Sequence, residues 1–149
     1  MVFTFRYEAL LSYRQHLKEK AEIELSMAQR QLRQCRELLE DFKESVQLAN
    51  QDLGAGLKEK ISSHTLKNHS EYIAALKGKI AAQVIEISKA EQVVRARLDV
   101  LLKKTKQYKV IERLKERDFQ KWNHHQHLLE QKEMSETAIL RHGRDFLQT

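Results

Sequence analysis

The most regular pattern along the chain is an alternation of apolar positions in its first third. Because spacings of four and three keep one stripe of a helix facing a partner helix, this alternation predicts one side of a left-handed coiled coil. The stripe continues less strictly upstream through Phe3, Tyr7, Leu10 and Leu17, so we expect a first helix over about residues 3–53. The ten regular positions are Ala21, Leu25, Ala28, Leu32, Cys35, Leu39, Phe42, Val46, Ala49 and Leu53.

A second apolar stripe begins after a break that contains glycine. Gly54 and Gly56 follow the first stripe directly, and glycine just past the last periodic residue favours a helix end. Ser62 and Ser63 are suitable N-caps, so we expect a turn over residues 54–62 and a second helix over about residues 63–142, closed by Gly143. The second stripe consists of Leu66, Ile73, Leu76, Ile80, Ile87, Ala90, Val94, Leu101, Tyr108 and Ile111, and is interrupted by Gln83, Arg97 and Lys104.

The two expected helices differ in length. At 1.5 Å per residue they would extend roughly 75 Å and 120 Å, and the short connection favours antiparallel packing. If they pair from the turn, the last part of the second helix projects beyond the first. We therefore predict an all-α fold with a single domain over residues 1–149: two long antiparallel helices form a left-handed coiled-coil hairpin, and the second helix is longer and projects.

Composition supports a narrow apolar seam rather than a compact core. The chain has no proline, 32% charged residues and 7% aromatic residues. Its net charge of +6 favours acidic partners, although interspersed carboxylates also fit an ordinary solvated surface. The densest basic stretch, Lys103 to Lys121, is diluted by Glu112, Glu116 and Asp118, which could pair with it within the helix. We therefore expect no nucleic-acid binding.

The sequence offers no set of residues for catalysis or for a cofactor. It contains no glycine-rich phosphate loop and no Ser/His/Asp arrangement. His124 and His127 are spaced to share a helix face, but only Glu130 and the distant His142 could complete a metal site, so we predict no metal and no cofactor. Cys35 lies in the apolar stripe, where it acts as a small hydrophobic residue. One cysteine, no secretory signal and no apolar run of membrane-spanning length indicate a cytoplasmic protein.

Several segments resemble the FliJ family of flagellar export proteins. Residues 3–14 are similar to the family's F-x-L-x-x-L-L-x-x-R start, and residues 66–76 to its L-x-N-Y-x-x-[FY]-I-x-x-L. Residues 112–117 and 130–136 resemble the L-x-x-R and E-x-K-x-x-D-E of its ending. The segments occur in the family's order across nearly the whole chain. His69 and Ser135 depart from the pattern, where tyrosine and aspartate are usual.

The resemblance implies a non-enzymatic, soluble stalk of the flagellar type III protein export apparatus. Such a protein would bind and stimulate the hexameric export ATPase and contact the cytoplasmic domain of the export gate and export chaperones. It would be a monomer, peripheral at the cytoplasmic face of the inner membrane through the export apparatus. The implied ATPase contacts are Phe3, Phe5, Arg6, Trp122 and Leu129. The implied gate contacts are Tyr72, Leu76, Lys79 and Gln83, of which Leu76, with Ile73 and Ile80, could instead pack in the seam.

Two alternatives remain on sequence grounds. The chain could be the equivalent stalk of a virulence type III secretion system, or a generic coiled-coil adaptor that dimerises through its seam.

Overall fold

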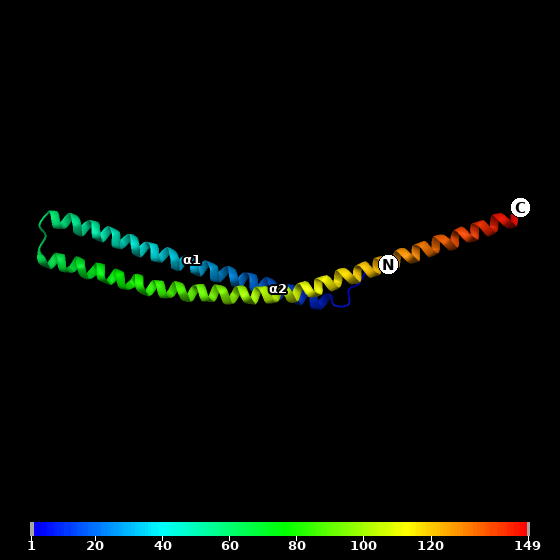
Figure 1. Ribbon diagram of the computed structural model, residues 1–149, viewed down its shortest axis with the longest axis horizontal. Helices are drawn as coiled ribbons and strands as arrows, with labels where there is room; N and C mark the ends of the chain where they lie inside the picture. The colour runs from blue at the N-terminus through cyan, green and yellow to red at the C-terminus, as the bar shows by residue number, and fades with distance from the viewer. Residues whose placement is uncertain (1, 149) are drawn as a thin grey trace. The chain divides into compact units, whose positions relative to one another are not determined.

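A computed structural model describes residues 2–148 and contains two α-helices in its described part, α1 (Glu8–Lys58) and α2 (Ser63–Gln148) (Figure 1). The helices have 51 and 86 residues and pack against each other. The described residues contain no strand. The predicted all-α pair with a longer second helix is therefore confirmed. None of the described helices is long and apolar enough to cross a membrane.

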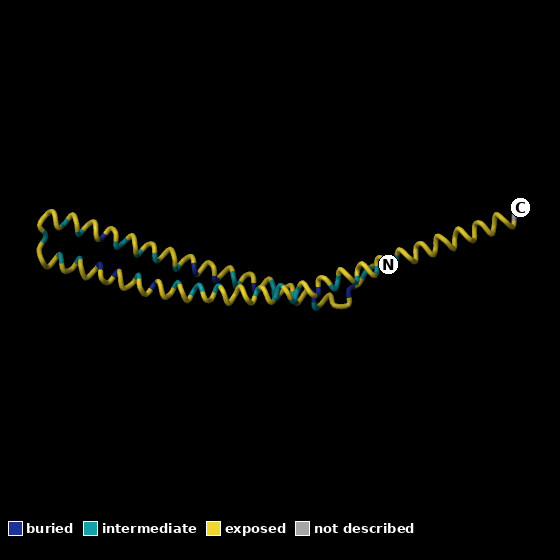
Figure 2. The backbone as a smooth tube through the Cα atoms, in the orientation of Figure 1, coloured by how far each residue is buried: buried dark blue, intermediate teal, exposed yellow. Residues whose placement is uncertain are grey.

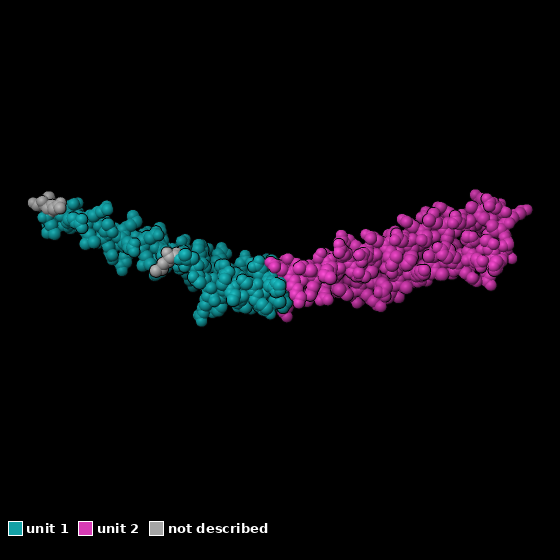
Figure 3. Space-filling view, turned by 180° about the vertical axis from the view of Figure 1, so that it is seen from behind, with its two compact units in different colours: residues 1–18, 104–149 teal, residues 19–103 magenta. Residues whose placement is uncertain are grey.

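The chain divides into two compact units (Figure 3). Unit 1 combines residues 1–18 with residues 104–149, and unit 2 comprises residues 19–103. Each unit contains part of both helices.

In unit 2 the two helices run antiparallel. Arg97 pairs with Glu24 at 3.5 Å and Glu91 pairs with Arg36 at 3.3 Å. Further along α1, Phe42 lies under the Lys79 ammonium group, which is 6.0 Å from the ring centroid. As the residue number increases along α1, the residue number of the contacting side chain on α2 decreases. This is the pairing that an antiparallel hairpin produces.

The seam of unit 2 follows the predicted stripe. All ten regular positions from Ala21 to Leu53 are buried or half-buried (Figure 2). The α2 positions from Leu66 to Leu101 are likewise covered, with Ile73 and Leu76 buried. Small residues at Ala21, Ala28 and Ala49, all buried, let the two backbones approach. The interior is thin, because no described side chain reaches complete burial.

One polar residue is buried in this seam. Gln83 retains only 8% exposure, and its side-chain amide donates a 2.9 Å hydrogen bond to the backbone carbonyl of Cys35 on α1. The position that interrupts the apolar stripe of α2 is therefore part of the seam. Because the buried amide has an acceptor, it avoids the free-energy penalty of an unpaired polar group.

The expected helix end at Gly54 is wrong, since α1 continues through both glycines to Lys58. A glycine within a helix costs only about 1 kcal/mol relative to alanine, which packing readily offsets. The left-handed residue that ends the helix is Lys60, with φ of 59°. Ser62 then caps α2, because its hydroxyl accepts a 3.2 Å hydrogen bond from the Thr65 amide.

Two other helix bounds also differ from those expected, whereas α2 begins at Ser63 as expected. Gly143 lies inside α2, which extends to Gln148 rather than ending near residue 142. At the other end of the chain, α1 begins at Glu8 rather than near residue 3. Residues 2–5 are extended or irregular, and the side chains of Phe3 and Phe5 pack against α2 without helical periodicity.

The core of unit 1 is a small cluster between residues 2–18, which we call the N-terminal segment, and α2. Phe5, Leu11 and Ile111 are buried, with partly buried side chains packed around them from Phe3, Leu10, Tyr108 and Leu114. Two basic residues of α1 add polar contacts between the N-terminal segment and α2. Arg14 donates a 2.8 Å hydrogen bond to the backbone carbonyl of Gln107, and the Lys18 ammonium lies 5.0 Å from the centroid of the Tyr108 ring.

Candidate interaction surfaces

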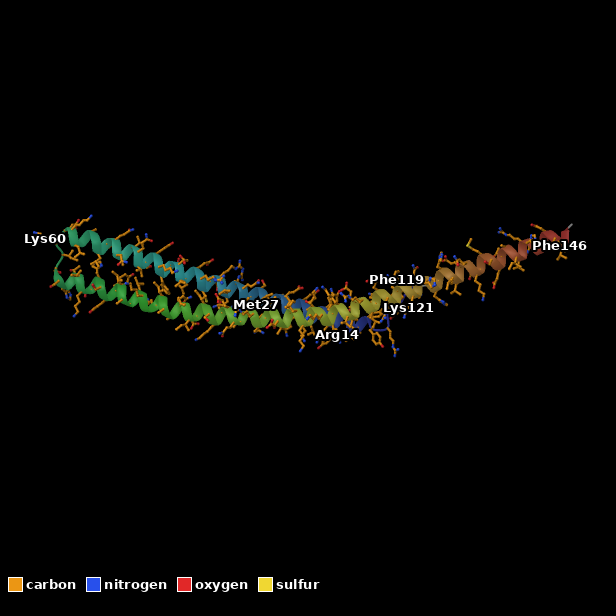
Figure 4. All side chains as sticks on the ribbon, in the orientation of Figure 1. Arg14, Met27, Lys60, Phe119, Lys121 and Phe146 are labelled. Atoms are coloured by element: carbon orange, nitrogen blue, oxygen red, sulfur yellow. The ribbon has the colours of Figure 1, made fainter. Side chains whose placement is uncertain are left out.

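An aromatic cluster joins the first residues of the chain to α2 in unit 1. The Phe3 ring lies 5.3 Å from that of Phe119 and 5.8 Å from that of Trp122, and the last two rings are stacked at 6.0 Å. Edge-to-face and offset aromatic pairs at these distances add packing energy beyond the area they bury. Phe3 and Trp122 are half-buried, whereas Phe119 is 45% exposed, so the cluster also presents an aromatic surface (Figure 4, Phe119).

The other N-terminal residues named as ATPase contacts differ in exposure. Phe5 is buried in the core of unit 1, with 5% exposure, so most of its side chain is occupied. Arg6 is exposed, and its guanidinium lies 5.5 Å from the centroid of the Tyr7 ring. Next to it, Lys115 on α2 forms a 2.9 Å ion pair with Glu8. This segment therefore offers a charged and aromatic outer surface on a buried apolar anchor.

The last part of α2 is exposed on all sides. Every side chain described from His127 to Leu147 is exposed (Figure 2). Leu129, the fifth residue named as an ATPase contact, lies here with 40% exposure. At 3.6 residues per turn, the exposed Leu140 and Leu147 lie in line with Leu129 along the helix. The exposed Leu128 and Ile139 lie roughly a quarter turn to one side of that line.

The residues named as gate contacts fall into two groups. Tyr72, with 55% exposure, and Lys79 are accessible on the surface of unit 2. Leu76 and Gln83 are buried in the seam, with 5% and 8% exposure. Gln83, named from the sequence as a gate contact, is thus a seam residue whose amide reaches across to α1. It could be mistaken for a surface residue because a polar side chain in a heptad normally indicates a solvated position.

A shallow hollow adjoins Tyr72 on unit 2. It has a volume of about 180 Å³ and lies between the two helices near the turn. His69, which replaces the family's usual tyrosine, contributes to it from α2. The remaining lining residues are Ser45, Leu48, Ala49 and Asp52 from α1.

The histidine-rich stretch of α2 does not assemble a metal site within the described residues. No group of three His, Cys, Asp or Glu side chains there is placed to hold a metal ion. His127 instead lies 3.4 Å from the side-chain amide of Gln131, one turn further along. Cys35 is half-buried in the seam, with the Gln31 amide 3.9 Å from its sulfur.

Comparison with known proteins identifies the family. The family model described as "Flagellar FliJ protein" matches residues 3–145. No curated protein and no solved structure shows a match to this chain. The family match includes most of both units and all the surfaces described above, except for the last residues of α2, 146–148. The chain therefore belongs to the FliJ family of non-catalytic components of the flagellar type III export apparatus.

Proposed function

We propose that this chain is a stalk that binds and stimulates the hexameric flagellar export ATPase, and that it contacts the cytoplasmic domain of the export gate and export chaperones. The observation that carries the proposal is the exposed apolar face at the end of α2. Leu129, Leu140 and Leu147 are 40%, 69% and 85% exposed, and together they form a stripe that a partner could cover. Within the export apparatus, we place the chain at the cytoplasmic face of the inner membrane.

The aromatic cluster of unit 1 supports the same assignment. Phe3, Phe119 and Trp122 hold the first residues of the chain against α2, so that the exposed Arg6 lies on an anchored segment. An anchored surface loses less conformational entropy when it binds than a free tail does. In this proposal, the ATPase contacts are Arg6, Leu129 and the exposed edges of the cluster, whereas Phe5 supports them from below.

The test is the ATP hydrolysis rate of the cognate flagellar export ATPase with and without this chain. We expect stimulation by the chain and no hydrolysis by the chain alone. The double substitution Leu129→Ser with Leu140→Ser should abolish most of the stimulation, because it removes the apolar stripe from an already exposed segment. The matched control is Met134→Ser with Ala138→Ser, which changes exposed residues on another face of the same helix. Equal loss in both double variants would contradict the stripe as the ATPase contact.

The gate contact is tested separately on unit 2. Tyr72→Ala and Lys79→Ala should weaken capture of the cytoplasmic domain of the gate while leaving the helix content unchanged, because both side chains are exposed. Substitution of the exposed Lys77, on the same helix, provides the control. Capture that is unaffected by both Tyr72→Ala and Lys79→Ala would remove this surface from the proposal.

A further inference from the structure

The basic stretch of α2 forms a stripe on one side of unit 1. Five basic residues follow each other at spacings of three or four, which places them on one face of a helix. With 1.5 Å rise per residue, the row extends over about 22 Å. We call this row the basic stripe; it consists of Lys106, Lys109, Arg113, Arg117 and Lys121.

The stripe faces away from the N-terminal segment. The α2 side chains that contact that segment include Tyr108, Ile111 and Lys115, which occupy the other side of the helix. Leu114, Phe119 and Trp122 also contact it. All five stripe residues are exposed (Figure 4, Lys121). The stripe is thus available to a partner while the core of unit 1 remains intact.

Three carboxylates lie within this stretch, those of Glu112, Glu116 and Asp118. Glu112 and Glu116 project from the flank of the helix, and neither forms an ion pair with a stripe residue in the described structure. The one ion pair of α2 in this region uses Lys115, which lies outside the stripe and pairs with Glu8. The described structure therefore shows no intrahelical ion pair that involves these cations, and the five cations of the stripe outnumber the three carboxylates of the stretch.

We infer that the basic stripe binds the surface of an anionic lipid bilayer directly. On the face of the helix that carries the stripe, Val110 is the one large apolar residue between residues 106 and 121. This face therefore lacks the apolar centre that is typical of a protein interface. It also lacks aromatic side chains on which single-stranded bases could stack, because Phe119 and Trp122 lie on the side of the helix that contacts Phe3. A straight row of cations contacts a flat anionic surface along its full length, but contacts the curved backbones of a duplex only where it crosses them.

This inference goes beyond the stalk proposal, because it gives the chain a membrane contact that does not depend on the gate or the ATPase. The phosphate groups of the lipids would attract the five cations without requiring insertion of the helix. Each Lys or Arg close to an anionic membrane surface strengthens binding by roughly fivefold, and the attraction decreases as salt is raised.

The experiment is co-sedimentation of the full chain with phosphatidylcholine vesicles that contain 30% phosphatidylglycerol or none. We expect binding only to the anionic vesicles, and a decrease as salt rises. The triple variant Lys109→Gln, Arg113→Gln, Arg117→Gln should reduce partitioning by about a hundredfold. The control variant Arg30→Gln, Arg33→Gln, Lys77→Gln removes the same charge from exposed positions of unit 2 and should bind within a few-fold of the unmodified chain.

Three results would overturn the inference. The first is an absence of binding to anionic vesicles at low salt. The second is an equal loss of binding in the two triple variants, which would show that only net charge matters. The third is binding to duplex DNA that is tighter than binding to anionic vesicles at the same phosphate concentration. If the triple variant of the stripe lost this DNA binding and the control variant kept it, nucleic acid would be the partner. None of these assays contains the ATPase, so their failure is distinguishable from failure of the stalk proposal.

Discussion

At the scale of single residues, polar side chains in the seam explain where the apolar pattern is irregular. Counting back from Ala21 in steps of three and four leads to Lys18, Arg14 and Leu11. The heptad therefore continues into unit 1, with two basic residues in seam positions. Each has its own partner on α2, the Gln107 carbonyl for Arg14 and the Tyr108 ring for Lys18. Sequence reasoning missed this register, because cations in a heptad normally indicate solvated positions.

The amide of Gln83 can be tested by replacement with residues of different volume. Gln83→Leu should raise the free energy of unfolding by about 1 kcal/mol, because an apolar side chain of similar size packs in the seam without a desolvated amide. Gln83→Ala should lower it by roughly 1–3 kcal/mol, since it removes both the hydrogen bond and the packing. Urea unfolding followed by circular dichroism measures both changes. Equal destabilisation by the two substitutions would show that the hydrogen bond itself dominates.

The aromatic cluster can be followed by tryptophan fluorescence, because Trp122 is the chain's single tryptophan. Phe3→Ala removes the ring 5.8 Å from Trp122 and should expose the indole to water. We expect a red shift of the fluorescence emission maximum with little change in helix content. Tyr13→Ala, at a position with 59% exposure, is the control and should leave the emission unchanged. An unshifted spectrum in Phe3→Ala would mean that the cluster does not persist in solution.

At the scale of elements, the apolar stripes predicted the paired helices well and the helix ends poorly. All twenty positions of the two main stripes are buried or half-buried, whereas Tyr7, expected to continue the first stripe upstream, is 40% exposed. The helix ends depend instead on energies of about 1 kcal/mol, which packing can override, as at Gly54 and Gly143. The burial of Phe5 could not be predicted from periodicity either, because residues 2–5 are not helical. Of the predicted site residues, Tyr72, Lys79, Arg6 and Leu129 are exposed as a contact requires, but partner binding itself stays a prediction.

The glycines of α1 give a prediction about helix stability. A Cβ added at Gly54 meets no atom within 4 Å, so Gly54→Ala should raise the free energy of unfolding by roughly 0.5–1 kcal/mol through helix propensity. At Gly56 an added Cβ would lie 3.1 Å from Cγ2 of Ile61, so Gly56→Ala should gain less or lose stability. Thermal or urea unfolding compares the two variants. A larger gain at Gly56 than at Gly54 would contradict the packing of Ile61 beneath the helix.

At the scale of the whole molecule, the pairing is satisfied within one chain. Each helix supplies the seam of the other in unit 2, and the N-terminal segment covers α2 in unit 1. The large apolar side chains left exposed are dispersed, except for the stripe at the end of α2. The net charge of +6 adds repulsion between copies.

We therefore expect a monomer in solution. Light scattering coupled to size-exclusion chromatography should give a mass near 17.6 kDa at micromolar concentration. A stable dimer would favour the alternative of a generic coiled-coil adaptor. If Leu129→Ser with Leu140→Ser dissolved such a dimer, the stripe would be a contact between copies rather than a surface for the ATPase.

Antiparallel pairing around one short turn also sets an order of folding. The side-chain hydrogen bonds that join α1 to α2 connect residues 48 and 55 positions apart in unit 2, and residues 93 and 107 positions apart in unit 1. Once contacts near the turn have formed, each further contact closes only a short additional loop and so costs little conformational entropy. We therefore expect the two helices to pair progressively from the turn toward the chain ends. The N-terminal segment would then be the last to dock and the first to leave. Native-state hydrogen exchange should accordingly show faster opening of residues 8–18 than of residues 66–80, and the reverse order would argue against this order of folding.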